Sequence, residues 1–220
     1  MKVLTVPGLG NSGPQHWQTR WEAIRPDTSR VELCMWTAPL RNPWVTKLEQ
    51  SIRSTQAPVI LVAHSLGCLT VAWWAALAAP KCGHPVAAAL LVAPPHLEPD
   101  SFPILSREFA RLPLGPLPFP TIVAASHDDP YATFDQVAAM ATGWGAHLVD
   151  AGSVGHINAA SGLGVWTEGI ALLDRLTRLV ETGGGKEALA DIQDHYARAA
   201  ADWSRENATR TPDAANPQRI

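Results

Sequence analysis

Hydrophobic positions along the chain fall into short runs that are separated by longer segments with helical periodicity. The runs are rich in valine, leucine, isoleucine and alanine, and they cover residues 2–7, 31–36, 58–64, 86–94, 121–126 and 146–152. Apolar residues follow one another in these runs without strict alternation, which is typical of parallel strands that are covered on both faces. The runs therefore predict the strands of a mostly parallel sheet.

The segments between the runs predict helices, which are expected at residues 14–24, 43–52, 66–80, 134–145 and 167–180. Apolar residues recur at helical spacing in most of them, whereas 66–80 is apolar almost all round, as a helix packed deep against a sheet should be. Strands that alternate with helices of this length indicate an α/β fold with right-handed crossovers. We expect a central sheet flanked by helices.

Three regions follow from these patterns. Residues 1–181 are expected to form one domain, because a chain of 220 residues fits a single core. Residues 182–206 predict a linker and an amphipathic helix, and 207–220 have the composition of a disordered tail. One stripe of this helix contains Leu189, Ile192, Tyr196, Ala199 and Trp203. The stripe must be covered, either by the same chain, which we favour, or by a second subunit in a homodimer.

The stretch from Pro94 to Pro120 holds many prolines and little periodicity, so it predicts an excursion between two strands. Such an insertion either shapes a pocket or packs as a plain surface loop. We keep both alternatives open at this point.

Composition and charge narrow the class of partner. The formal net charge of −3 gives no reason to expect nucleic acid or an anionic membrane surface, so a small molecule is the expected partner. The three cysteines lack close spacing, which argues against a disulfide framework and a zinc site. We find neither a secretory signal nor an apolar segment of the roughly 20 residues that span a bilayer, so a cytoplasmic location is expected.

The segment "LVAHSLG", residues 61–67, carries the first chemical signal. A serine between small residues on a tight strand-to-helix turn is the nucleophile elbow pattern, and Ala63 and Gly67 supply the small neighbours of Ser65. The alternative is a serine that only caps a buried helix. His64 should point away from Ser65 on such a turn, so we expect it to be structural and not the base.

A serine nucleophile needs a histidine base and a carboxylate that orients it. In this topology both should follow later strands, in the order Ser, Asp, His. Asp128 and Asp129 both follow the run at 121–126, and we favour Asp129 because it lies at the turn before Pro130. His156, in the glycine-flanked loop after the next run, is the expected base.

Two backbone N–H groups are expected to form the oxyanion hole. One is that of Leu66, directly after the nucleophile, and the other is that of Leu9, in the loop after the first run. Gly8 and Gly10 are expected to make room for close approach of this loop, and both are also candidates for the pocket. The following residues His16 and Trp17 are candidates for the pocket, although Trp17 could equally be core and His16 a surface residue.

Four segments together resemble the small α/β-hydrolase family that contains the retinoblastoma-binding serine hydrolase and bacterial YdeN-like hydrolases. They are "VPGLGNSGPQHWQTRWE", "VAHSLGCLTVAWW", "ASHDDPY" and "GHINAASGLGVWTEG". The resemblance implies a compact α/β-hydrolase without a large lid domain, an esterase-like activity, and a triad of Ser65, Asp129 and His156. Where family members carry glycine before the His-Ser pair, this chain has Ala63, and the segment beyond Glu181 lies outside the shared pattern.

The expected function is therefore cleavage of a small carboxylic ester through an acyl-enzyme intermediate, without a metal or an organic cofactor. Two rivals stay open. One is a binding protein that keeps the fold without catalysis, and the other is a different enzyme on the same scaffold, such as an acyltransferase or a carbon–carbon bond hydrolase.

Overall fold

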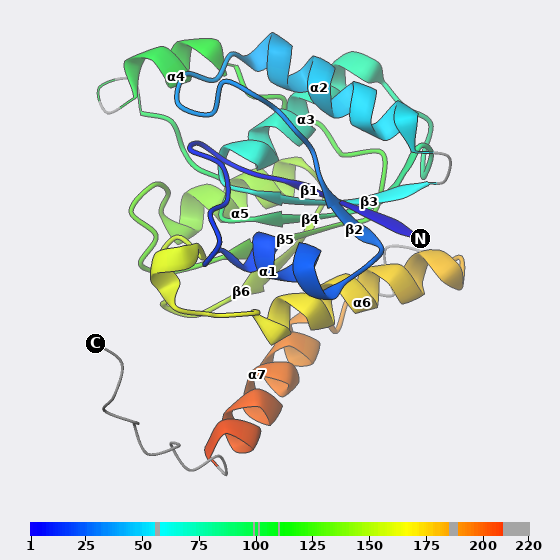
Figure 1. Cartoon of the computed structure of the whole chain (residues 1–220), viewed down its shortest axis with the longest axis vertical. Coiled ribbons are helices and arrows are strands. Elements are labelled where there is room, and N and C mark those ends of the chain that lie inside the picture. Colours follow the sequence, from blue (N-terminus) through cyan, green and yellow to red (C-terminus); the bar gives the residue numbers. More distant parts are fainter. Residues whose placement is uncertain (56–57, 99, 101, 110, 185–188, 209–220) are drawn as a thin grey trace, which may run out of the picture.

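Six parallel strands form one sheet in the order β2-β1-β3-β4-β5-β6, shown in Figure 1. The structure is a computed structural model that describes residues 1–55, 58–98, 100, 102–109, 111–184 and 189–208. The strands are β1 (Lys2–Val6), β2 (Thr28–Arg30), β3 (Val59–His64), β4 (Val86–Val92), β5 (Thr121–Ala125) and β6 (His147–Asp150). Because all of them are parallel, their carboxyl ends lie along one edge of the sheet, where ligands of α/β proteins bind.

Five of the six strands lie at the predicted runs, but the strand predicted at residues 31–36 is wrong. The chain forms β2 at Thr28–Arg30 instead, and the side chains of Val31 and Leu33 are buried beyond the end of the strand. Cys34 and Met35 have positive φ angles of 58° and 47°, which no extended strand can accommodate. An apolar run therefore marked buried positions here without marking a strand.

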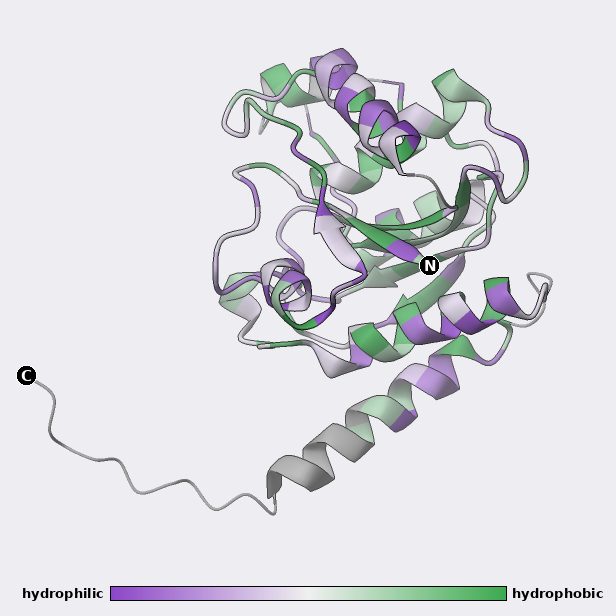
Figure 2. Cartoon of the chain, turned by 45° about the vertical axis from the view of Figure 1, so that its right-hand side comes forward, coloured by the Kyte–Doolittle hydropathy of each residue, from purple (hydrophilic) through white to green (hydrophobic). Residues whose placement is uncertain are grey.

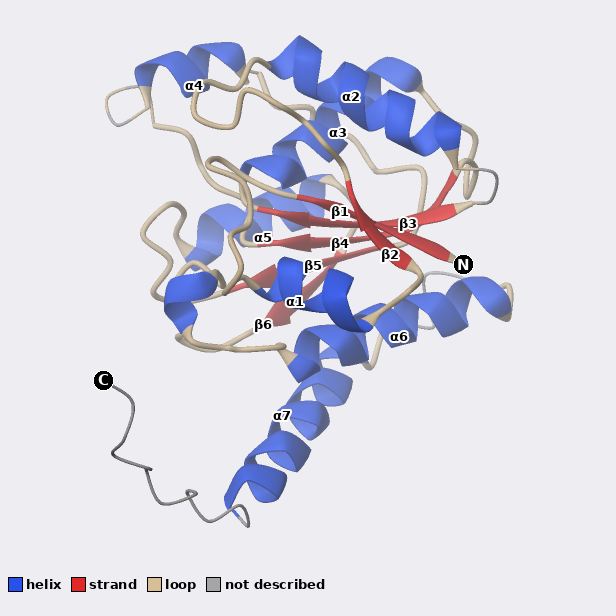
Figure 3. Cartoon of the chain, viewed as in Figure 1, coloured by secondary structure: helices blue, strands red, loops and turns tan. Residues whose placement is uncertain are grey.

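Helices cover both faces of the sheet, as Figure 3 shows. They are α1 (Trp17–Ile24), α2 (Arg41–Ser54), α3 (Leu66–Ala78), α4 (Pro103–Glu108), α5 (Phe134–Gly143), α6 (Thr167–Glu181) and α7 (Ile192–Ala208). A short 3₁₀ turn, η1 (Ala159–Ser161), follows β6. The helices α2, α3 and α5 pack on one face and α1 and α6 on the other, so the molecule has three layers.

Each face of the sheet has its own apolar core. Along β3, Leu61 and Ala63 belong to the core under α2 and α3, whereas Ile60 and Val62 belong to the core under α1 and α6. Successive side chains of a strand point to opposite faces, so both sets must be apolar. This explains why the predicted strands are hydrophobic without alternation, and Figure 2 shows the central strands largely in green.

The C-terminal segment packs on the same chain, which is one of the two alternatives left open for its apolar stripe. Leu189, Ile192 and Tyr196 are buried in the core under α6. The side chain of Trp203 and residues 209–220 lie outside the described part of the chain, and so does the greater part of the predicted tail. The helix α7 is therefore attached to the domain through its first turns.

The side chain of Gln193 attaches α7 to the outermost strand. Its Oε1 accepts a hydrogen bond from the backbone N–H of Asp150 at 2.7 Å, and its Nε2 donates to the backbone carbonyl of Asp150 at 3.2 Å. Since β6 has a neighbouring strand on one side only, this amide satisfies backbone groups at an open edge. Within the described residues, we find no helix long and apolar enough to cross a bilayer.

Candidate active site

Ser65 lies on the sharp turn between β3 and α3, at the carboxyl edge of the sheet. Its backbone has φ 55° and ψ −127°, a region that residues other than glycine rarely adopt. Its N–H donates to the carbonyl of Val92, the last residue of β4, at 2.9 Å. A serine in this strained position, raised above the strand ends, matches the geometry expected of a nucleophile elbow.

Two glycines allow the chain to pass close to this turn. A Cβ on Gly67 would lie 2.3 Å from the carbonyl oxygen of Val6, and a Cβ on Gly8 would lie 2.7 Å from the Cβ of Ser65. Both distances are too short for real side-chain atoms, so the loop after β1 and the elbow can be this close only with glycine at both positions. Gly8 makes room as predicted. Gly10 does not, since open space surrounds its Cβ position and its role is its positive φ of 77°.

Three side chains from three strand ends form one hydrogen-bonded row. The Ser65 Oγ lies 2.8 Å from the His156 Nε2, and the His156 Nδ1 lies 2.8 and 2.9 Å from the two carboxylate oxygens of Asp129. The side chains of His156 and Asp129 are 8% and 1% exposed, so this pair is shielded from water. The structure thus brings together the three residues that the sequence predicted as one unit.

The two neighbouring aspartates have different partners. The Asp128 Oδ1 accepts hydrogen bonds from the Ser126 Oγ at 2.8 Å and from the backbone N–H of Gly155 at 2.6 Å, so this carboxylate joins the loops after β5 and β6. The same bonds, that of Ser126 first, lower the pKa of Asp128 below its usual range. Asp129 contacts the imidazole of His156 instead, which agrees with the preference for Asp129.

His64 is a structural neighbour of the row, as expected, and not its base. It is 5% exposed, and its Nε2 donates to the backbone carbonyl oxygen of His156 at 2.9 Å. Burial is the largest cause of a pKa well below the ordinary value, and the nearby His16 and His156 lower it further. His64 is therefore a neutral donor that supports the backbone of residue 156.

A pocket of about 410 Å³ opens beside Ser65. The predicted residues Leu9, His16, Ser65, Leu66 and His156 line it. Sequence reasoning did not identify the other residues of the lining, which are Asn11, Gly13, His64, Pro95, Leu97, Phe102, Leu105, Tyr131, Asn158, Ala159 and Ala160. Four of these come from the proline-rich excursion and α4, so the excursion shapes the pocket, as one of the two alternatives held. The remaining lining residues lie close in the sequence to the predicted site residues, and no other sequence pattern marked them.

Three predicted pocket residues lie elsewhere. Gly8 and Gly10 are outside the lining. Trp17 is buried with its ring 4.7 Å from that of Trp21 and 5.1 Å from that of Trp166, and its Nε1 donates to the carbonyl of Ile157 at 2.7 Å. Its large apolar surface is buried beneath the loop that carries His156, so Trp17 belongs to the core, as the alternative held.

His16 lines the pocket and is buried, contrary to the alternative of a surface residue. It caps the N-terminus of α1, where its Nδ1 accepts a hydrogen bond from the N–H of Gln18 at 3.2 Å. Burial, followed by the charges of Arg30 and His156, lowers its pKa to about 4. At neutral pH the imidazole is therefore uncharged, and the acceptor role of Nδ1 leaves the proton on Nε2.

The sequence and the fold of the chain are similar to those of known proteins. The family model described as serine hydrolase matches residues 3–175. A YdeN-like hydrolase from Pectobacterium atrosepticum is 34% identical, with 82% of this chain and 89% of that chain covered and a TM-score of 0.68. No curated protein matches the chain.

Two more distant solved structures share the fold. The ydeN gene product from B. subtilis is 17% identical, with 80% of this chain and 98% of that chain covered and a TM-score of 0.64. Est1E from Butyrivibrio proteoclasticus is 12% identical, with 71% and 80% covered and a TM-score of 0.55. At these identities the likeness concerns the fold alone.

Proposed function

Since the chain belongs to the serine hydrolase family, we propose that it cleaves a small, uncharged carboxylic ester through an acyl-enzyme intermediate. The observation that carries this proposal is the row in which Asp129, His156 and Ser65 are joined by hydrogen bonds of 2.8 to 2.9 Å. This is the arrangement that an unactivated hydroxyl needs to attack a carbonyl near neutral pH.

In the first step, the Ser65 Oγ attacks the ester carbonyl while the His156 Nε2 takes its proton. Asp129 orients the imidazole and stabilises its positive charge. His156 then gives the proton to the leaving alcohol as the C–O bond breaks. Water, deprotonated by the same imidazole, attacks the acyl-enzyme and releases the acid and the free Ser65.

The negative oxygen that forms during each attack requires hydrogen-bond donors. Leu66 is the first residue of α3, so no carbonyl of the preceding helical turn is available to its N–H. Leu9 lines the pocket and directly follows Gly8, where an added Cβ would lie 2.7 Å from the Cβ of Ser65. We assign these two N–H groups to the oxyanion hole, where the N-terminus of α3 adds a favourable dipole.

The pocket supports the choice of an uncharged substrate. Among the described residues, its lining contains no aspartate, glutamate, lysine or arginine, and its wall from the excursion is apolar, with Pro95, Leu97, Phe102 and Leu105. A carboxylate or ammonium group on the substrate would lose hydration here without gaining an opposite charge. We therefore expect neutral esters to react faster than charged esters of similar size.

A fluorophosphonate probe tests the nucleophile, with Ser65→Ala as the matched control. We expect one adduct on Ser65 of the folded wild type, located by peptide mass spectrometry, and none on the variant. A panel of p-nitrophenyl esters then tests the reaction, with acetate, butyrate and hexanoate as neutral acyl groups and hemisuccinate as a charged one.

Folded wild-type protein that neither reacts with the probe nor hydrolyses any ester would overturn the proposal in favour of a binding protein. Transfer of the acyl group to an added alcohol in preference to water would instead identify an acyltransferase. Product analysis with and without the alcohol distinguishes the two reactions.

A further inference from the structure

The loop between β1 and α1, residues 7–16, lies against the elbow and carries Leu9. Within this loop, the N–H of Asn11 donates to the carbonyl of Gly8 at 3.1 Å, which closes a tight turn with Leu9 and Gly10 at its centre. Asn11 itself has a positive φ of 66°. The direction of the Leu9 N–H therefore depends on how firmly the rest of the molecule holds this turn.

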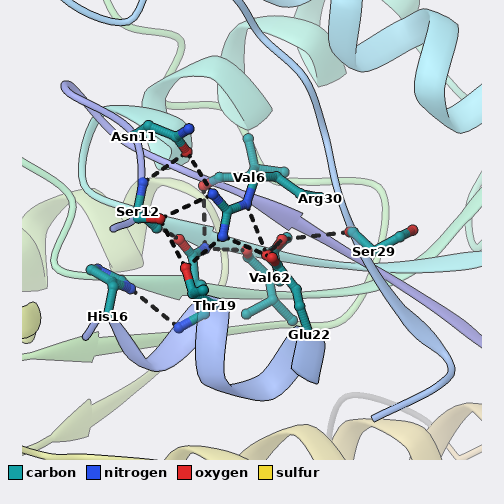
Figure 4. Close-up of polar contacts among 11 residues, drawn as sticks. Val6, Asn11, Ser12, His16, Thr19, Glu22, Ser29, Arg30 and Val62 are labelled. Carbon is teal, nitrogen blue, oxygen red and sulfur yellow. Dashed lines mark hydrogen bonds and ion pairs between the residues drawn. The ribbon is translucent and has the colours of Figure 1, made fainter. Parts of the chain in front are cut away.

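The backbone of Trp36, whose carbonyl accepts the N–H of Gly10 at 2.8 Å, and one side chain from the edge strand β2 hold the turn in place. The Arg30 Nη1 donates to the Asn11 Oδ1 at 3.1 Å and to the Ser12 carbonyl at 3.0 Å, as Figure 4 shows. The Asn11 Oδ1 also accepts the backbone N–H of Ser12 at 2.7 Å. Arg30 thus fixes the amide side chain and the following backbone of the residue that closes the turn.

The other side of the guanidinium is fixed to α1. The Arg30 Nε and Nη2 lie 3.1 and 2.7 Å from the two carboxylate oxygens of Glu22, and Nη2 also donates to the Thr19 Oγ1. The Thr19 Oγ1 in turn donates to the Ser12 carbonyl at 2.8 Å. The side chains of Arg30 and Glu22 are only 16% and 18% exposed. A planar group with donors in fixed directions can join three segments in this way, whereas an ammonium group cannot.

We propose that Arg30 is a positioning residue for ester hydrolysis, acting through Asn11 on the turn that aims the Leu9 N–H at the oxyanion. This inference rests on the proposed function. Removal of this largely shielded guanidinium should also cost stability, because it leaves the carboxylate of Glu22 without its partner. The effect that is specific to the positioning role is a loss of kcat in the folded protein.

Arg30→Met tests the proposal, and Arg25→Met is the matched control. Arg25 forms an ion pair with Asp27 at 3.1 Å and another with Asp174 at 3.3 Å. Arg25 and Asp27 directly precede β2, so they lie at the amino ends of the strands, whereas Ser65 lies at the carboxyl ends. Both substitutions keep an unbranched side chain and remove a bridging guanidinium. Only Arg30→Met removes contacts with the loop at residues 7–16.

We expect Arg30→Met to lower kcat for p-nitrophenyl butyrate by roughly 10- to 100-fold and to change KM by less than about threefold, since the donor acts mainly on the transition state. A trifluoromethyl ketone, whose adduct with serine carries an oxyanion, should lose affinity by the same factor as kcat/KM. Arg30→Lys should fall between wild type and Arg30→Met. Arg25→Met should keep the kcat of the wild type.

Equal kcat values for Arg30→Met and Arg25→Met, or a loss of ketone affinity that does not follow kcat/KM, would overturn the proposal. If Arg30→Met does not fold, Asn11→Gly replaces it, since glycine keeps the positive φ while removing the amide that Arg30 holds. Unchanged kcat in Asn11→Gly would likewise overturn it. Failure of the proposed function is a separate result, because the wild type would then hydrolyse no ester.

Discussion

The His64 Nε2 donates a hydrogen bond to the backbone carbonyl of His156 over 2.9 Å. His64 is the last residue of β3 and directly precedes Ser65, so the strand that presents the hydroxyl also holds the backbone of the imidazole that bonds to it. Neither residue can shift far without affecting the other. His64 therefore controls the distance between Ser65 and His156, because it is bonded to Ser65 along the chain and to the backbone of His156 by this hydrogen bond.

Replacing His64 should weaken this control. We expect His64→Leu to lower kcat for a neutral ester by about tenfold or more and the free energy of unfolding by about 1–3 kcal/mol, because the buried carbonyl of His156 loses its donor. His64→Gln, whose amide can donate from a similar position, should restore part of both. Steady-state kinetics and urea unfolding measure the two effects, and equal activity in both variants would contradict this role.

The aspartate pair gives a second prediction. Asp129→Asn should lower kcat by about 10⁴-fold, because the amide no longer stabilises the imidazolium or fixes its tautomer. Asp128→Asn weakens only the bridge to Ser126 and Gly155, so we expect less than about a tenfold loss. Kinetics on both variants, with circular dichroism to check folding, separates the roles. The opposite order of losses would assign the orienting carboxylate to Asp128.

Alanine at the two crowded glycines should have different consequences. In Gly67→Ala the new Cβ meets a backbone oxygen at 2.3 Å, so the backbone must move, and we expect the free energy of unfolding to fall by about 3 kcal/mol. In Gly8→Ala it meets the Ser65 Cβ at 2.7 Å, which displaces the hydroxyl and should lower kcat by about 100-fold. Gly115→Ala, where nothing lies within 4 Å, is the control. Full activity of Gly8→Ala would contradict this prediction, because it would mean that the loop after β1 can move away from Ser65 without displacing the hydroxyl.

His16 predicts part of the pH dependence of stability. Its pKa is lowered from 6.5 to about 4 in the folded chain, so below pH 6.5 the unfolded chain binds the extra proton first. Protonation of His16 in the unfolded chain therefore lowers the free energy of unfolding as the pH falls from about 6.5 to about 4. The total loss is about 3 kcal/mol, and above about pH 6.5 none of it occurs. His16→Asn should flatten this loss while its amide oxygen still caps α1. Urea midpoints between pH 7 and pH 4 measure the slope, and identical slopes would contradict the assignment.

Much of the fold follows from the sequence because each strand of a parallel sheet is buried on both faces and must be apolar throughout. The same rule misplaced β2, since burial of Val31 and Leu33 does not require a strand and the positive φ angles at Cys34 and Met35 left no pattern to detect. Trp17 illustrates the same limit. Its helical spacing indicated burial, but not whether it faced the core or the pocket.

The row of Ser65, Asp129 and His156 could be predicted because each residue follows a strand, and parallel strands end at one edge. The wall made by Leu97, Phe102 and Leu105 could not, because its segment has no periodicity that assigns side chains to a direction. The contacts of Arg30 were also out of reach, since they join β2, α1 and a loop that come together only in the folded chain.

The amide of Gln193 occupies the hydrogen-bonding groups of Asp150 at the outer side of β6. An unpaired strand edge is a template on which a strand of another molecule can assemble. By occupying the backbone groups of Asp150, the first turns of α7 oppose association of the molecule through this end of β6. We therefore expect removal of this helix to promote association through β6 while the row of Ser65, His156 and Asp129 stays intact.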